Sequence, residues 1–88
     1  MEVTGLQNPV VKAAAELKQK KYRTQNGLYL AEGLRTAEEA VAYKAVETLF
    51  YVATDDERTM RLLEDAAAQN IKLVCVNENV MKKIADTE

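Results

Sequence analysis

Residues 8–35, NPVVKAAAELKQKKYRTQNGLYLAEGLR, place a helix, a basic cluster and an apolar run in close succession. Asn8 can cap a helix, and Pro9 suits the first helical position. Apolar residues then recur at helical spacing, which predicts a helix that continues to about Tyr22. Its expected apolar face consists of Val10, Ala14 and Leu17.

The second half of this stretch predicts a turn and a strand. Residues 24–27 end in Asn-Gly, a pair that readily adopts positive φ angles in turns. The apolar run at residues 28–31 predicts a short buried strand, which Gly33 should end. Positive charge gathers between the helix and this strand, at Lys18, Lys20, Lys21 and Arg23.

Helices and strands are expected to alternate along the rest of the chain. Residues 34–43 predict a helix, 48–52 a strand, and 54–57 a capping box that opens a third helix. The apolar face of that helix should consist of Met60, Leu63 and Ala67, flanked by Leu62 and Ala66. Asn70 should end the helix. A strand at 71–76 follows, and then a short helix capped by Asn77. This alternation predicts an α/β fold with a mostly parallel sheet covered by helices on both faces.

Composition sets limits on the function. The 88 residues suffice for one small domain. The net charge is −2 overall, but residues 1–30 hold five cations and two acids, so they carry +3. The chain contains no histidine and a single cysteine, Cys75, which we interpret as a small apolar residue in a strand rather than a nucleophile. Its sequence contains no apolar run of membrane-spanning length and no signal-peptide pattern, and we expect a cytoplasmic location.

The basic cluster has two possible interpretations. Long cationic side chains close together, with Lys12 earlier on the same helix, are suited to RNA or DNA phosphates. Cations at the end of a helix also complement the helix dipole without any function. Glu32 likewise either contacts a base edge or caps the following helix. For Asp55, Asp56 and Glu57, the capping box explains the acids better than a metal site does.

Three blocks of sequence carry a family resemblance. The blocks are Asn-Pro-Val-Val-Lys at residues 8–12, Lys-Lys-Tyr-Arg at residues 20–23 and Gly-Leu-Tyr-Leu-Ala-Glu-Gly-Leu-Arg at residues 27–35. In the order and spacing of these blocks, the chain resembles the N-terminal substrate-binding domain of SpoU/TrmH-type RNA 2′-O-methyltransferases. The resemblance covers residues 1–88, which we therefore expect to form one RNA substrate-binding domain.

The resemblance implies a three-layer α/β/α sandwich similar to the ribosomal-protein fold that binds kink-turn RNA. It implies that the domain binds structured ribosomal or transfer RNA. Methyl transfer from S-adenosylmethionine would belong to a knotted C-terminal catalytic domain, absent from this chain, through which the parent protein would form a homodimer. Carried over by position, the expected RNA-binding residues are Asn8, Lys12, Lys20, Lys21, Arg23, Glu32, Gly33 and Arg35.

The sequence thus predicts the RNA-recognition domain of a methyltransferase. We expect this domain to have no catalytic residues, bound cofactor or metal of its own. Lys12, Lys20, Lys21 and Arg23 would bind phosphates, while Glu32 and Arg35 would contact bases or sugars. The alternative is a non-catalytic α/β module whose basic helix end binds an acidic protein partner.

Overall fold

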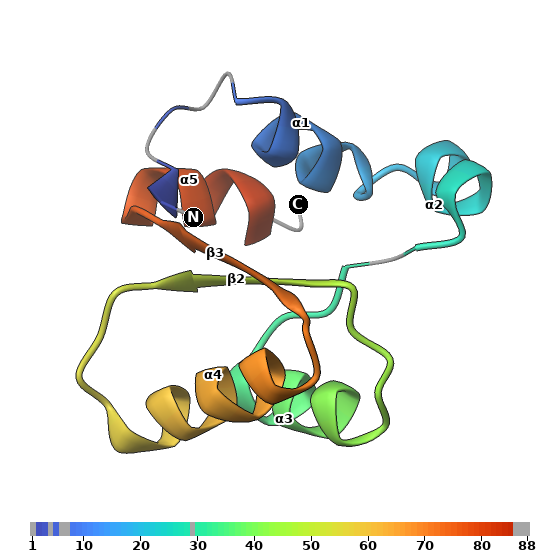
Figure 1. Ribbon diagram of the computed structural model, residues 1–88. Coiled ribbons are helices and arrows are strands. Elements are labelled where there is room, and N and C mark those ends of the chain that lie inside the picture. The colour runs from blue at the N-terminus through green and yellow to red at the C-terminus, as the bar shows by residue number, and fades with distance from the viewer. Residues whose placement is uncertain (1, 4, 6–7, 29, 86–88) are drawn as a thin grey trace.

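The computed structural model describes residues 2–3, 5, 8–28 and 30–85 (Figure 1). Helices and strands alternate over most of this length. In chain order the elements are β1 (Glu2–Val3), α1 (Pro9–Glu16), α2 (Lys20–Asn26), α3 (Leu34–Ala42), β2 (Thr48–Val52), α4 (Glu57–Ala68), β3 (Lys72–Val76) and α5 (Glu78–Ala85).

The strands form a parallel sheet in the order β1-β3-β2. Phe50 pairs with Val74 across β2 and β3, and Val3 pairs with Val76 across β1 and β3. Helices cover both faces of this sheet: α1 and α5 lie on one, with α2 beyond the end of α1, and α3 and α4 lie on the other (Figure 1). The prediction of a small α/β/α sandwich with a parallel sheet is confirmed.

Each face of the sheet has its own apolar core, because successive side chains of a strand point to opposite faces. In β3, Val74 and Val76 belong to the core under α1 and α5, whereas Leu73 packs into the core under α3 and α4. The buried residues of the first core are Val11, Ala14, Val74, Val76, Val80 and Ile84. Those of the second are Val41, Leu62, Ala66 and Ile71.

The strand predicted at residues 28–31 is wrong. Leu28, Leu30 and Ala31 lie outside any strand, and Tyr29 lies outside the described residues. Leu30 is half-buried and packs against the first core, so the apolar run correctly indicates burial. An apolar run by itself does not supply the backbone pairing that makes a strand, and the third strand of the sheet is β1 instead.

The first predicted helix is broken into two. α1 ends at Glu16 and α2 begins at Lys20, and between them the amides of Lys18 and Gln19 donate to carbonyls three residues earlier. Gln19 is extended, with ψ of 132°, and turns the chain into α2. The turn predicted at residues 24–27 is therefore helical as far as residue 26. Gly27 ends α2 with a φ of 66°, a conformation that glycine adopts without strain.

The third predicted helix starts later than expected. Asp56, not Thr54, caps α4: its carboxylate accepts from the Thr59 amide at 2.9 Å and from the Thr59 hydroxyl at 2.9 Å. Thr54 instead accepts a hydrogen bond from the Asp56 amide. The buried face of α4 consists of Leu62 and Ala66, so the face predicted from Met60, Leu63 and Ala67 is rotated from the observed one, and Met60 is exposed.

The predicted ends of the last two helices are confirmed. Asn70 follows α4 with a φ of 61°, and it therefore takes the left-handed conformation expected of a helix stop. The Asn77 side chain accepts from the Val80 amide at 2.8 Å, so it caps α5 as predicted.

Candidate nucleic-acid interface

The two helical layers carry opposite net charge. The segments that form α1, α2 and α5, residues 9–26 and 78–85, hold seven lysines and arginines against two glutamates, a net +5. Helices α3 and α4, residues 34–42 and 57–68, hold three cations against five acids, a net −2. We call the first set the basic layer. A polyanion would approach the domain from this side.

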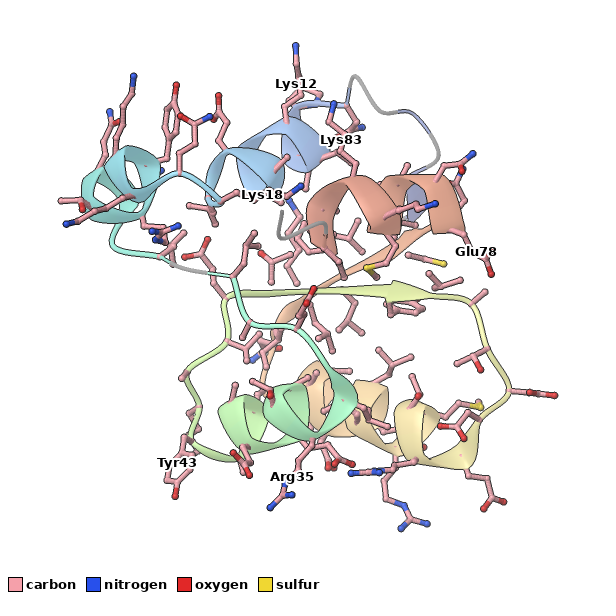
Figure 2. All side chains as sticks on the ribbon, turned by 180° about the vertical axis from the view of Figure 1, so that it is seen from behind. Lys12, Lys18, Arg35, Tyr43, Glu78 and Lys83 are labelled. Atoms are coloured by element: carbon pink, nitrogen blue, oxygen red, sulfur yellow. The ribbon has the colours of Figure 1, made fainter. Side chains whose placement is uncertain are left out.

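Three of the predicted phosphate-binding residues are exposed on the basic layer. Lys12 lies on α1 and points away from the sheet (Figure 2), and Lys20 and Lys21 lie in the first turn of α2. The ammonium of Lys21 lies 5.0 Å from the centre of the half-buried Tyr22 ring. Their exposure leaves these cations accessible to an anionic ligand.

Arg23 has a structural contact that its charge did not reveal. Its Nη1 donates to the carbonyl oxygens of Leu17 at 3.1 Å and Lys18 at 2.8 Å. These carbonyls follow the last turn of α1, where helical partners run out and the helix dipole is negative. Arg23 therefore links α2 to the end of α1. Together with Lys20, Thr24, Gly27 and Leu28, it also lines a shallow hollow on α2.

Asn8, Glu32 and Gly33 lie at the ends of helices. Asn8 caps α1 as predicted, since its Oδ1 accepts from the Val10 amide at 2.9 Å. Gly33 occupies the N-cap position of α3 with a φ of 99°, which favours glycine over any other residue. Glu32 is exposed and precedes this cap. The N-cap position itself is a glycine, so no side chain at that position caps α3.

The structure does not bring Arg35 together with the other predicted site residues. Arg35 is exposed on α3, where it forms an ion pair with Glu39 at 3.6 Å. In Figure 2 it points outward from the layer opposite to the one that carries Lys12. The predicted site thus divides into Lys12, Lys20, Lys21 and Arg23 on the basic layer, and Arg35 on the far side of the sheet.

Sequence reasoning missed the contribution of α5 to the basic layer. Lys82 and Lys83 lie in its last turn, and the ammonium of Lys18 donates to the carbonyl oxygen of Lys83. In sequence these lysines are about 60 residues from the basic cluster, so no local pattern connects them. The signal that could have found them is the apolar face of α5, which predicts that this helix packs on the sheet.

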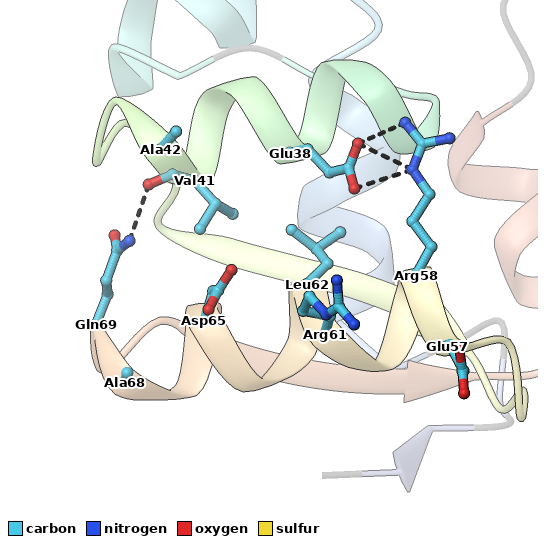
Figure 3. Close-up of a pocket in the computed structure, with 10 residues that line it drawn as sticks. All are labelled: Glu38, Val41, Ala42, Glu57, Arg58, Arg61, Leu62, Asp65, Ala68 and Gln69. Atoms are coloured by element: carbon cyan, nitrogen blue, oxygen red, sulfur yellow. Dashed lines mark hydrogen bonds and ion pairs between the residues drawn. The ribbon is translucent and has the colours of Figure 1, made fainter.

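A groove between α3 and α4 lies on the opposite side of the molecule (Figure 3). The Arg58 guanidinium donates to both carboxylate oxygens of Glu38, at 2.6 to 3.1 Å. This bond lowers the pKa of Glu38 and raises the pKa of Arg58. Glu57 and Asp65 also line the groove. Its cations are therefore balanced by acids, which makes it a poor site for a polyanion.

Other classes of site find little support in the described part of the chain. Residues 2–3, 5, 8–28 and 30–85 contain no cluster of three potential metal-ligating His, Cys, Asp or Glu side chains. Of the three acids considered for metal binding, Asp56 is occupied as the cap of α4, and its hydrogen bonds with Thr59 lower its pKa. Cys75 is a half-buried free thiol in β3. In the same ranges, every helix is too short or too polar to cross a bilayer.

Comparison with known proteins identifies a domain family and a similar solved structure. Residues 8–88 match the model of the MRM3-like substrate binding domain family. Among solved structures, the chain is similar to an rRNA methyltransferase from Sinorhizobium meliloti, with 29% sequence identity and a TM-score of 0.79 over 100% of this chain. The alignment spans 32% of the methyltransferase chain, so the present chain corresponds to about a third of it. No curated protein matches the sequence.

Proposed function

We propose that this chain, which belongs to the family of MRM3-like substrate binding domains, binds structured ribosomal RNA through the basic layer. The match confirms the kind of domain that the sequence blocks predicted. The observation that carries the proposal is the difference in net charge between the two helical layers. Exposed lysines gather on α1 and α2, although the whole chain has a net charge of −2. In our account, Lys12, Lys20 and Lys21 bind phosphates.

Arg23 has a mixed role in this proposal. One nitrogen of its guanidinium is occupied by the carbonyls of Leu17 and Lys18, so its first effect is to hold α2 in place. Through that contact it presents Lys20 and Lys21. Asn8 acts similarly, because its cap fixes the start of α1 and so positions Lys12.

We propose that methyl transfer belongs to another part of the whole protein. By the family resemblance, the reaction would transfer the methyl group of S-adenosylmethionine to a ribose 2′-hydroxyl, as in SpoU/TrmH enzymes. The described residues form a charged groove between α3 and α4 and a shallow hollow on α2, and we assign neither to this cofactor. We assign no catalytic step to them. The homodimer and the cytoplasmic location remain predictions.

A charge-reversal titration tests the function. The variant Lys12→Glu/Lys20→Glu/Lys21→Glu should bind a structured rRNA fragment at least about tenfold more weakly than the wild type, because it loses phosphate contacts. The control Lys44→Glu/Arg61→Glu reverses two exposed cations on the side of α3 and α4 and should bind nearly as the wild type does.

Several results would count against the proposal. Equal weakening per reversed charge by the two variants would indicate a response to net charge alone, and salt-insensitive binding by all three proteins would exclude phosphate recognition. Capture of an acidic protein without any RNA binding would favour the alternative of a protein-interaction module. A transfer RNA titrated in parallel shows whether the domain prefers ribosomal RNA.

A further inference from the structure

Helix α5 packs directly beside α1. Val11 and Ala14 of α1 share one buried core with Val80 and Ile84 of α5. The two helices therefore cover the same face of the sheet and present their outer surfaces on the same side of the domain (Figures 1 and 2). Lysines on α5 thus extend the surface that carries Lys12.

A specific contact fixes the end of α5 to the chain that follows α1. Lys18, just beyond α1, donates from its ammonium to the carbonyl oxygen of Lys83, in the last turn of α5. Carbonyls in the last turn of a helix carry partial negative charge, so a cation is stabilised there. This contact engages Lys18 and leaves Lys82 exposed and the side chain of Lys83 half-exposed.

Little acidic charge lies beside these lysines on the described part of α5. Its one acid, Glu78, lies in the first turn of the helix, about 6 Å from Lys82 and about 7.5 Å from Lys83 along the axis. Among the described residues, no ion pair joins Glu78 to either lysine. Figure 2 shows Glu78 at the end of α5 remote from Lys18, whose ammonium contacts the Lys83 carbonyl at the other end of the helix. A nucleic-acid strand laid along α1 would therefore meet positive charge on α5 as well.

We propose that the RNA-binding surface continues from α1 onto α5, where Lys82 and Lys83 bind backbone phosphates; this inference rests on the proposed RNA-binding function. The contacts would be to phosphates rather than to bases, because lysine is a flexible point charge without the planar fork that reads a base edge. These residues therefore contribute affinity and position the RNA, and they carry little sequence specificity.

The salt dependence of binding tests this inference. The 88-residue chain and its variant Lys82→Gln/Lys83→Gln are titrated with a labelled structured rRNA fragment at several salt concentrations. Each phosphate contact adds about 0.7 to 0.9 to the slope of log K against log salt. Loss of two contacts should reduce the magnitude of that slope by about 1.5. The control Lys44→Gln/Arg61→Gln, on the side of α3 and α4, should retain the wild-type slope.

The outcomes separate the two proposals. If the wild type binds with a salt-dependent affinity and the α5 variant has the same slope, the role of α5 is wrong and the RNA-binding function stands. If the wild type shows no salt-dependent RNA binding, both are overturned. The single variant Lys82→Gln, at an exposed position, should reduce the magnitude of the slope by about 0.8. It replaces the double variant in the titration if the double variant unfolds.

Discussion

Arg23 offers a sharp test of the account, because it separates a structural role from phosphate binding. Its Nη1 bridges two carbonyls just beyond the end of α1, one part-buried at 3.1 Å and one exposed at 2.8 Å. A hydrogen bond from a charged donor contributes about 1.5–3 kcal/mol when protected, and less when exposed. Removal of the guanidinium in Arg23→Met should therefore lower the free energy of unfolding by about 2 kcal/mol.

Substitution by lysine distinguishes charge from geometry. Arg23→Lys retains the positive charge, but a single ammonium on a different stem does not reproduce the bridge between both carbonyls. We expect a loss of about 1 kcal/mol, half that of Arg23→Met. In a domain of this size, 1 kcal/mol shifts the Tm by about 4–8 °C. Urea denaturation at pH 7, with a thermal melt beside it, measures both losses.

The same pair of variants should differ in the same order in RNA binding. Arg23→Lys keeps a cation near Lys20 and should retain most of the affinity at a temperature where both proteins are folded. If Arg23→Lys and Arg23→Met are both as stable as the wild type, then the bridge does not stabilise the end of α1, and our reading of Arg23 is refuted. A surface substitution such as Lys44→Met serves as the control.

Three further predictions concern stability. Asn8→Ala removes the cap that accepts from the Val10 amide and should lower the free energy of unfolding by about 1 kcal/mol in urea titrations. Val74→Ala deletes part of a fully buried side chain in β3 and should cost about 2–3 kcal/mol by the same assay; a loss under 1 kcal/mol would contradict its place in the core. Folding lowers the pKa of Glu38 and Asp56, so their stabilising contribution is present near neutral pH and is lost as the pH falls below about 4. Asp56→Asn should therefore flatten the acid limb of stability against pH; an unchanged limb would show that the Asp56 contact contributes nothing.

Local signals in the sequence predicted much of the fold. Asn8, Asn70 and Asn77 mark helix ends through their own side chains or backbone preference, and the structure places each as expected. The strands at residues 48–52 and 72–76 were identified because β-branched and aromatic residues pack well in buried sheets.

The errors at residues 28–31 and before Lys20 arise from contacts that a local periodicity does not report. Leu30 is buried as its apolar neighbours suggested, but strand pairing is a property of two segments and no single run reveals it. The break before Lys20 is stabilised by the Arg23 side chain reaching back to Leu17 and Lys18. Helical periodicity does not report such a contact.

The candidate site was only partly predictable for the same reason. The lysines of α1 and α2 are neighbours in sequence, so charge counting found them. Arg35 follows them closely along the chain, but the fold takes it to the other side of the sheet, and Lys82 and Lys83 arrive on the basic layer from the far end of the chain. Layer topology, rather than sequence distance, determines which cations share a surface.

Ultraviolet crosslinking of the 88-residue chain to a structured rRNA fragment, with mass spectrometry of the linked peptides, tests the central claim most directly. The account predicts crosslinks within residues 8–27 and 78–85, which weaken as salt rises. Crosslinks concentrated in residues 34–42 and 57–68 would contradict it, as would their complete absence at low salt.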